Sequence, residues 1–220
     1  MREFPCCAGS GAQLKIPDLV PVLSWILSRG QCRYCGAAIS LAIPFLECSM
    51  IAVTIITAAL VPDNAQAAEA GLLGWLLILL VVMDLRYRIL PDALTAALLA
   101  SGLSIALVLR TTDFVEALFG AAVGGGSFLL LRFLYHRLRG TEGLGLGDVK
   151  MMTGLGAWFG PSWLPLLVLV AATAGLLIAF LKAWKDGTGV SATTIVPFGA
   201  YLGGGAVLLW SLKATHGWGW

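Results

Sequence analysis

The sequence predicts an all-α protein, a polytopic helix bundle that spans a membrane. Of its 220 residues, 59% are hydrophobic and only 12% are charged, and the mean hydropathy is +0.89. Apolar runs recur along the chain at about the ~20 residues that a helix needs to cross ~30 Å of hydrocarbon. A spanning β-barrel shows alternating hydrophobicity instead, and this sequence has no such alternation. These observations favour membrane helices over a barrel.

Residues 1–40 form the one sizeable polar region and are predicted to be a small cytoplasmic domain. They contain Cys6, Cys7, Cys32 and Cys35. A region of this size cannot build a conventional hydrophobic core and usually needs a metal or another staple. The five cysteines of the chain do not match a secreted disulfide framework. The net charge of +2 is too small and too dispersed to indicate a nucleic-acid partner.

Residues 41–220 are predicted to be the transmembrane domain, with the lipid bilayer as its surroundings. About seven spans are expected, at 41–61, 67–84, 92–110, 114–134, 148–160, 163–181 and 194–212. Gly120 and Gly124 are spaced four residues apart, which is typical of a helix face that packs closely on another helix.

The basic residues predict how these spans are oriented, because cytoplasmic loops next to spans are enriched in Lys and Arg. If residues 1–40 are cytoplasmic, 12 of the 14 basic residues lie on or near the cytoplasmic side. Only Arg110 and Lys213 then lie outside. The sequence therefore predicts a multi-pass protein with a cytoplasmic N-terminus.

This topology places Asp84 and Asp148 at the same face of the membrane. Asp84 ends one span, and Asp148 begins another directly after the alternating glycines Gly143, Gly145 and Gly147. The span at 148–160 is short, since 13 residues at about 1.5 Å each cover only ~20 Å. A carboxylate at membrane depth is costly and is by default a functional candidate. We expect Asp84 and Asp148 to meet, with Gly145 and Gly147 as supporting residues.

Three further residues have both a functional and a structural interpretation. Asp92 follows Pro91 in the first turn of a span, where the helix dipole stabilises a negative charge, so a cap is favoured over catalysis. Lys150 either supports the aspartates or substrate binding, or anchors the span on the positive side. Glu47 lies inside a span and either supports the site or pairs with a nearby polar group.

Two neighbouring carboxylates can hold one proton between them, which is the arrangement of an aspartic protease. The ionised carboxylate takes a proton from attacking water, and the protonated one donates to the peptide carbonyl. Only His136 and His216 are present, so a Ser-His-Asp site is poorly supplied, and no H-E-x-x-H zinc motif occurs. A transporter or scaffold that uses the same aspartates as a proton relay remains an alternative, as does an inactive relative.

Several motifs together resemble the type IV prepilin peptidases, intramembrane aspartyl proteases of bacteria with a G-x-G-D motif. The segments DLRYRILPD and GLGDVKMM look like the two aspartate segments of that family, at 84–92 and 145–152. Further similar segments lie at 20–25, 29–36, 43–47, 154–160 and 196–200. The resemblance implies that Asp84 and Asp148 are catalytic. It also implies a bacterial inner-membrane enzyme that cleaves prepilin or pseudopilin precursors after a glycine at the cytoplasmic face.

The resemblance carries two cofactor expectations. Many members of the family methylate the new N-terminal amine with S-adenosylmethionine, so a second, methyltransferase activity is expected here. The family usually has two Cys-x-x-Cys pairs suited to zinc; Cys32 and Cys35 match one pair, whereas the other aligns Cys7 with Ser10. Zinc and reduced, metal-free thiols both remain open at these cysteines. The family normally also carries a membrane helix ahead of the cysteines, so either a late start or a trimmed variant is expected.

Overall fold

The computed structural model describes residues 7, 9–108, 113–141, 143–185 and 197–216, the side chains of 213–216 excepted. The described residues form helices and no strand, with one isolated β-bridge between Gln31 and Ala38. This confirms the predicted all-α class. They group into two compact units, 1–62 and 63–220, and each unit is described by itself.

The first unit contains a short 3₁₀ helix (η1, Ile16–Leu19), a one-turn helix α1 (Leu23–Leu27) and the long helix α2 (Ala42–Leu60). Polar contacts hold its loops together. Asp18 accepts hydrogen bonds from the Lys15 backbone N–H and the Tyr34 hydroxyl, and the Trp25 indole N–H donates to the Ile39 carbonyl. Few apolar side chains ahead of α2 are buried. The unit therefore depends on polar contacts and on its cysteines more than on a hydrophobic core.

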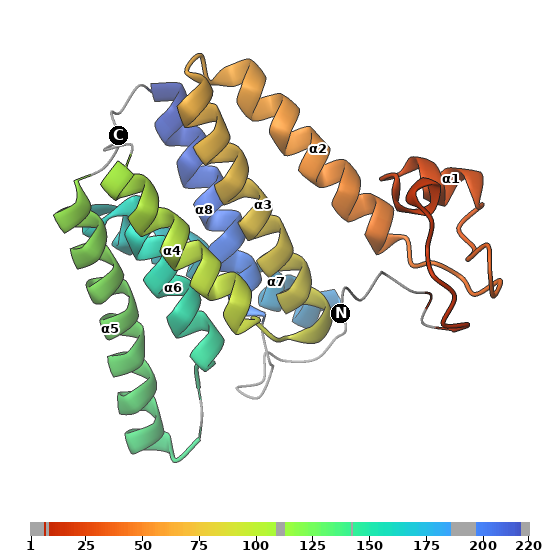
Figure 1. The fold of residues 1–220 in the computed structure, drawn as a ribbon. Helices are drawn as coiled ribbons and strands as arrows, with labels where there is room; N and C mark the ends of the chain where they lie inside the picture. Colours follow the sequence, from red (N-terminus) through yellow and green to blue (C-terminus); the bar gives the residue numbers. More distant parts are fainter. Residues whose placement is uncertain (1–6, 8, 109–112, 142, 186–196, 217–220) are drawn as a thin grey trace. The chain divides into compact units, whose positions relative to one another are not determined.

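The described residues of the second unit form six α-helices. Figure 1 shows how these helices pack side by side as a bundle. They are α3 (Asn64–Tyr87), α4 (Asp92–Val108), α5 (Phe114–Arg139), α6 (Leu146–Phe159), α7 (Leu164–Lys185), which follows the short η2 (Pro161–Trp163), and α8 (Phe198–His216). Asp63 and Asp113 start α3 and α5, because each side chain accepts backbone N–H groups of the first turn. Gly140 ends α5 in a left-handed conformation, with φ of 69°.

Helix α6 lies at the centre of this bundle and contacts α4, α5, α7 and α8. Nine of its fourteen residues are buried. The Trp158 indole N–H donates to the Leu98 carbonyl of α4 at 2.9 Å, and Gly156 faces Gly120 of α5 so closely that their backbones touch. The expected close-packing face at Gly120 and Gly124 is therefore confirmed, since Gly124 likewise packs on the Met152 backbone.

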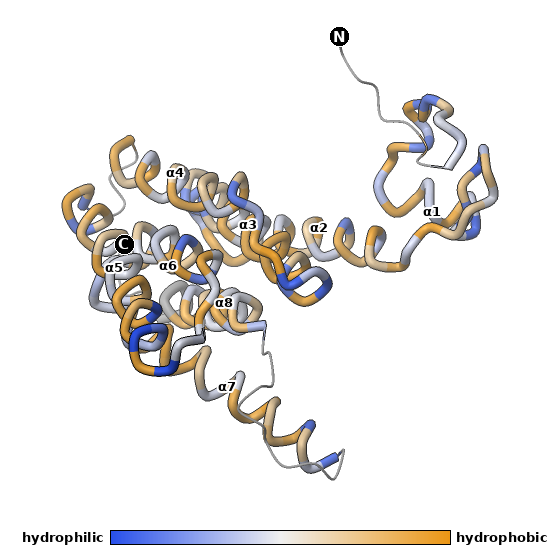
Figure 2. The backbone as a smooth tube through the Cα atoms, turned by 90° about the horizontal axis from the view of Figure 1, so that it is seen from below, coloured by the Kyte–Doolittle hydropathy of each residue, from blue (hydrophilic) through white to orange (hydrophobic). Residues whose placement is uncertain are grey.

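Each of the seven predicted spans contains a helix, but the number of spans is not confirmed. Within the described residues, four helical segments are long and apolar enough to cross a membrane: 42–60, 64–87, 114–139 and 161–185. Helices α4 and α8 contribute shorter apolar stretches, and α6, at fourteen residues, covers only ~21 Å at about 1.5 Å per residue. Figure 2 shows that hydrophobic residues dominate the long helices. Many of their large apolar side chains are exposed.

The contact between α5 and α6 makes a prediction about stability. A Cβ added at Gly120 would overlap the Gly156 carbonyl oxygen, whereas one added at Gly126 of the same helix would meet nothing. Because backbone cannot yield as a flexible side chain does, we expect Gly120→Ala to cost at least ~1–3 kcal/mol of stability. Gly126→Ala should leave stability unchanged or slightly higher. Thermal unfolding in detergent measures both, and equal midpoints for the two variants would contradict the close backbone contact.

Candidate active site

Asp84 is a buried carboxylate in the last turn of α3, with 6% of the residue exposed. Its Oδ2 accepts a hydrogen bond of 2.7 Å from the backbone N–H of Ala200, 116 residues further along the chain. Ala200 lies in the first turn of α8, where N–H groups have no partner within the helix. The positive end of the α8 dipole therefore offsets the unfavourable position of Asp84 at the negative end of α3.

Asp148 lies in the first turn of α6 and is half-buried. Its carboxylate accepts hydrogen bonds from the backbone N–H groups of Gly145 and Gly199. Gly145 is the N-cap of α6, and the charge of Asp148 also interacts with that of Asp84. Gly199 and Ala200 are neighbours at the start of α8, so two successive amides of one helix serve the two aspartates. The structure brings Asp84 and Asp148 together at the start of α8, and we call them the aspartate pair.

The loop that delivers Asp148 is fixed by contacts with α5. The Arg132 side chain donates to the Leu144 carbonyl, and Gly143 lies flat against the Tyr135 ring, where a Cβ would not fit. On the other side, Gly147 packs against Leu90 of the α3–α4 connection, and Gly199 packs against the same leucine. Leu90 thus lies between the start of α6, which carries Asp148, and the start of α8, whose amides bind the aspartate pair.

Asp92 and Lys150 form an ion pair at 2.6 Å, and both side chains are largely exposed. Lys150 therefore points to the start of α4 rather than to the aspartate pair, and Asp92 stands outside the pair. Such exposed ion pairs contribute about 0–1 kcal/mol. This contact favours the structural interpretation of both residues.

Glu47 lies in α2 of the first unit, where its Oε2 accepts the backbone N–H of Val22 at 2.7 Å. Val22 has a φ of 60°, a backbone conformation that is rare for a β-branched residue. Glu47 therefore ties the start of α1 to α2. This contact is the polar partner that the structural interpretation of Glu47 requires.

Most basic residues of the second unit lie at the end that holds the aspartate pair; Lys213, near the C-terminal end of α8, lies at the other end. Alternate helices run in opposite directions, so α3, α5 and α7 end there and α4, α6 and α8 begin there (Figure 1). The basic residues of this end are Arg86, Arg88, Arg132, Arg137, Arg139, Lys150, Lys182 and Lys185. Their common position agrees with the distribution expected from the sequence; Arg110 lies outside the described residues.

Gly199, Ala200 and Leu90 are the residues of this site that the sequence analysis did not single out. The segment at 196–200 was noted only as one of several family-like motifs, without a role. A helix start after Pro197 supplies amides that any residue could offer, so residue type alone gives little signal. Only the folded chain shows that they face the aspartate pair.

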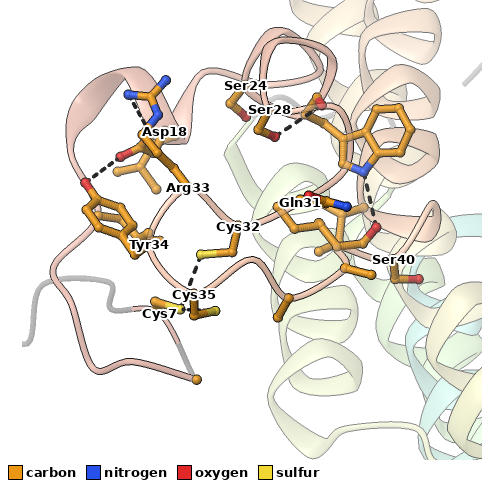
Figure 3. A pocket seen from close by; sticks show the side chains of 18 of the residues that line it. Cys7, Asp18, Ser24, Ser28, Gln31, Cys32, Arg33, Tyr34, Cys35 and Ser40 are labelled. Atoms are coloured by element: carbon orange, nitrogen blue, oxygen red, sulfur yellow. Dashed lines mark hydrogen bonds and ion pairs between the residues drawn. The ribbon is translucent and has the colours of Figure 1, made fainter.

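A second cluster of reactive side chains lies in the first unit, where Cys7, Cys32 and Cys35 converge (Figure 3). The Cys7 Sγ is 3.4 Å from each of the other two sulfur atoms, and all three lie within 4.8 Å of one another. Zinc–thiolate bonds of about 2.3 Å place the sulfur atoms of a tetrahedral site ~3.8 Å apart, so the three thiols fit a metal. Cys6 lies outside the described residues.

The surroundings favour the thiolate form of Cys7, whereas Cys35, which has a backbone hydrogen bond from Ala37 but faces the other two sulfur atoms, has a raised thiol pKa. Hydrogen bonds from the Ser10 side chain and backbone, with smaller contributions from Cys32 and Cys35, lower the pKa of the Cys7 thiol to about 6. The three cysteines also line a pocket of about 520 Å³ that extends to Trp25 and Glu47. The three sulfur atoms could therefore hold a metal ion, and the pocket beside them gives small molecules access to it.

Comparison with known proteins identifies two matching families. Residues 71–180 match the type IV leader peptidase family, and residues 2–61 match the bacterial peptidase A24 N-terminal domain. No solved structure matches the chain.

Three curated relatives illustrate the likeness. A prepilin leader peptidase/N-methyltransferase of Burkholderia pseudomallei is 36% identical over 92% of this chain, and one of Aeromonas salmonicida is 32% identical over 96%. A type 4 prepilin-like proteins leader peptide-processing enzyme of Escherichia coli is 34% identical over 94%. The alignments span 65%, 72% and 75% of these relatives, respectively. The chain belongs to the type IV leader peptidase family.

Proposed function

We propose that this protein is a membrane-embedded aspartic endopeptidase that removes the leader of prepilin or pseudopilin precursors. The observation that carries the proposal is the aspartate pair, held by successive amides at the start of α8. The names of the relatives support leader cleavage as the reaction, and they do not support the transporter or scaffold alternative. We take Asp84 and Asp148 as the catalytic residues.

The geometry supports a general acid–base mechanism. Two neighbouring carboxylates can hold one proton between them, and the ionised one takes a proton from a water molecule. The water oxygen bonds to the peptide carbonyl carbon, while the protonated carboxylate donates to the carbonyl oxygen. When the C–N bond breaks, the carboxylate that took the proton from water donates it to the leaving nitrogen, and the other carboxylate takes a proton from a hydroxyl of the tetrahedral intermediate, so the pair again holds one proton. The amides of Gly199 and Ala200 keep both carboxylates in place throughout.

The side of the membrane follows from charge. Most basic residues of the second unit lie at the same end of the bundle as the aspartate pair. Basic residues are enriched on the cytoplasmic side of membrane proteins. We therefore place the aspartate pair and residues 1–40 at the cytoplasmic face of a bacterial inner membrane, with 41–220 as the transmembrane domain. A precursor whose basic leader stays in the cytoplasm would present its cleavage site at this depth.

Two cofactors belong to the proposal. The relatives' names include N-methyltransferase, which supports transfer of a methyl group from S-adenosylmethionine to the new N-terminal amine. Zinc is proposed at Cys7, Cys32 and Cys35, where it would cross-link two loops of a unit that buries little apolar surface. Proteolysis by the aspartate pair needs neither.

Replacing either aspartate tests the catalytic assignment. Asp84→Asn or Asp148→Asn removes the carboxylate that exchanges protons, so cleavage should fall by about 10²–10⁴-fold or more. Asp92→Asn is the matched control, because it removes only an exposed ion pair and should leave cleavage nearly unchanged.

The measurement is co-expression with a prepilin bearing a basic leader, in cells that lack their own peptidase. Precursor size reports cleavage, and the mass of the mature N-terminus reports methylation. Membrane extracts must show equal amounts of each variant. Processing by the Asp148→Asn protein at the wild-type rate would exclude the mechanism.

The start of α8 gives a separate prediction about positioning. A Cβ added at Gly199 would lie 3.0 Å from the Asp84 Oδ2 and 2.9 Å from the Leu90 Cδ1, so Gly199→Ala should displace the carboxylate. We expect kcat to fall by about 10- to 100-fold with little change in KM, because small misplacements of reacting groups are costly. Gly204→Ala in the same helix meets no neighbouring atom and serves as the control. Equal kcat values for the two variants would show that Gly199 does not position the pair.

A further inference from the structure

The cysteine cluster is built from two copies of one turn. The first copy is Cys7-x-x-Ser10-Gly11-Ala12, and the second is Cys32-x-x-Cys35-Gly36-Ala37. In each copy the Cys N–H donates to the Ala carbonyl five residues later, at 2.8 Å in both. The Gly N–H donates back to the Cys carbonyl, at 2.8 Å and 2.9 Å. The glycines, with φ of 67° and 70°, share one left-handed conformation.

Because the two turns have the same hydrogen bonds, Ser10 occupies in the first turn the place that Cys35 occupies in the second. The contacts agree with this equivalence. A Cβ on Gly9, the residue before Ser10, would lie 3.1 Å from the Cys35 sulfur, so the first turn faces the second. Two such turns offer four ligand positions for a metal. Cys7, Cys32 and Cys35 place sulfur at three of them, and Ser10 places a hydroxyl at the fourth.

A serine hydroxyl is a poor substitute for a thiolate, since it stays protonated near neutral pH and zinc is bound in proteins chiefly by thiolate, imidazole and carboxylate groups. Structural zinc sites are closed by four protein ligands, whereas sites with three keep one position open. We propose that this chain forms a three-thiolate zinc centre whose fourth position, beside Ser10, is open to a small exchangeable ligand. The inference rests on the proposed binding of zinc to these cysteines.

The surroundings of the cluster give such a ligand a route of entry. Cys7, Cys32 and Cys35 all line the 520 Å³ pocket, and the Cys35 residue is exposed (Figure 3). A chelator or thiol can thus reach the metal without unfolding the unit. Three thiolates also leave the centre with one negative charge fewer than four would.

Zinc exchange in the full chain, purified in detergent, tests the open position. The variants are Ser10→Cys, which restores a fourth thiolate, and Ser10→Ala, which removes only the hydroxyl. We expect about one zinc per chain in all three proteins by elemental analysis. Transfer of zinc to a chromogenic chelator should be at least tenfold slower for Ser10→Cys than for wild type, and unchanged within about twofold for Ser10→Ala.

Cobalt substitution gives a second readout that needs no variant to fold. Addition of 2-mercaptoethanol should strengthen the thiolate-to-cobalt absorption of the wild-type protein, because a fourth sulfur enters the open position.

The cysteine ligands are tested separately. Cys7→Ser, which removes one thiolate of the cluster, should bind less zinc than the wild-type protein.

Each contrary result has a distinct meaning. Absence of zinc from the wild-type protein under loading conditions would overturn the zinc proposal itself. Bound zinc with equal release from wild type and Ser10→Cys, or a cobalt spectrum insensitive to added thiol, would overturn only the open position. Markedly faster release from Ser10→Ala would make the hydroxyl a ligand and would also overturn the open position.

Discussion

The hydrogen bond from the Ala200 amide to the Asp84 carboxylate is the contact on which the second unit depends. A carboxylate buried at the C-terminal end of a helix is disfavoured twice, by loss of hydration and by the helix dipole. The start of α8 answers both, because it offers unpaired N–H groups and the positive end of another dipole. Because the first turn of α8 lies beside Asp84 at the end of α3, α8 runs antiparallel to α3 and contacts it. The preceding amide, that of Gly199, binds Asp148. The start of α8 thus holds the end of α3 and the start of α6 together.

The same convergence explains why α6 is short and rich in small residues. Its N-terminus must reach the aspartate pair while its body passes between α4 and α5. Gly154 packs on Leu98, and Gly156 packs on Gly120, so neighbouring backbones approach to distances that a Cβ would prevent. Close packing of this kind supplies the attraction that burial of apolar surface cannot supply between helices in lipid. Rigid placement of Asp148 is thus a consequence of how α6 is packed, rather than of its own loop alone.

The sequence predicted the features that depend on side-chain type, but it did not predict the backbone hydrogen bonds. Apolar runs located every long helix, and charge bias brought Asp84 and Asp148 to one end, although 64 positions separate them. The amides of Gly199 and Ala200 were missed because any residue except proline offers an N–H, and only tertiary structure directs it. The partners of Lys150 and Glu47 were open for a related reason, since a long charged side chain has several neighbours within reach. Helix length alone does not confirm seven spans, because α6 has only fourteen residues and, within the described residues, α4 and α8 contribute shorter apolar stretches.

The site also extends beyond the segment that identifies the family. The leader peptidase match covers 71–180 and includes both aspartates, yet each aspartate also accepts a backbone amide of α8, which begins at Phe198. Without α8, Asp84 would keep its position at the end of α3 but lose its hydrogen-bond donor. A buried acceptor left without a partner costs roughly 1–3 kcal/mol or more, so the carboxylate would turn toward solvent or bind a proton. Either change removes the arrangement on which the chemistry rests. The proposed active site therefore includes the start of α8 as well as the two segments that carry the aspartates.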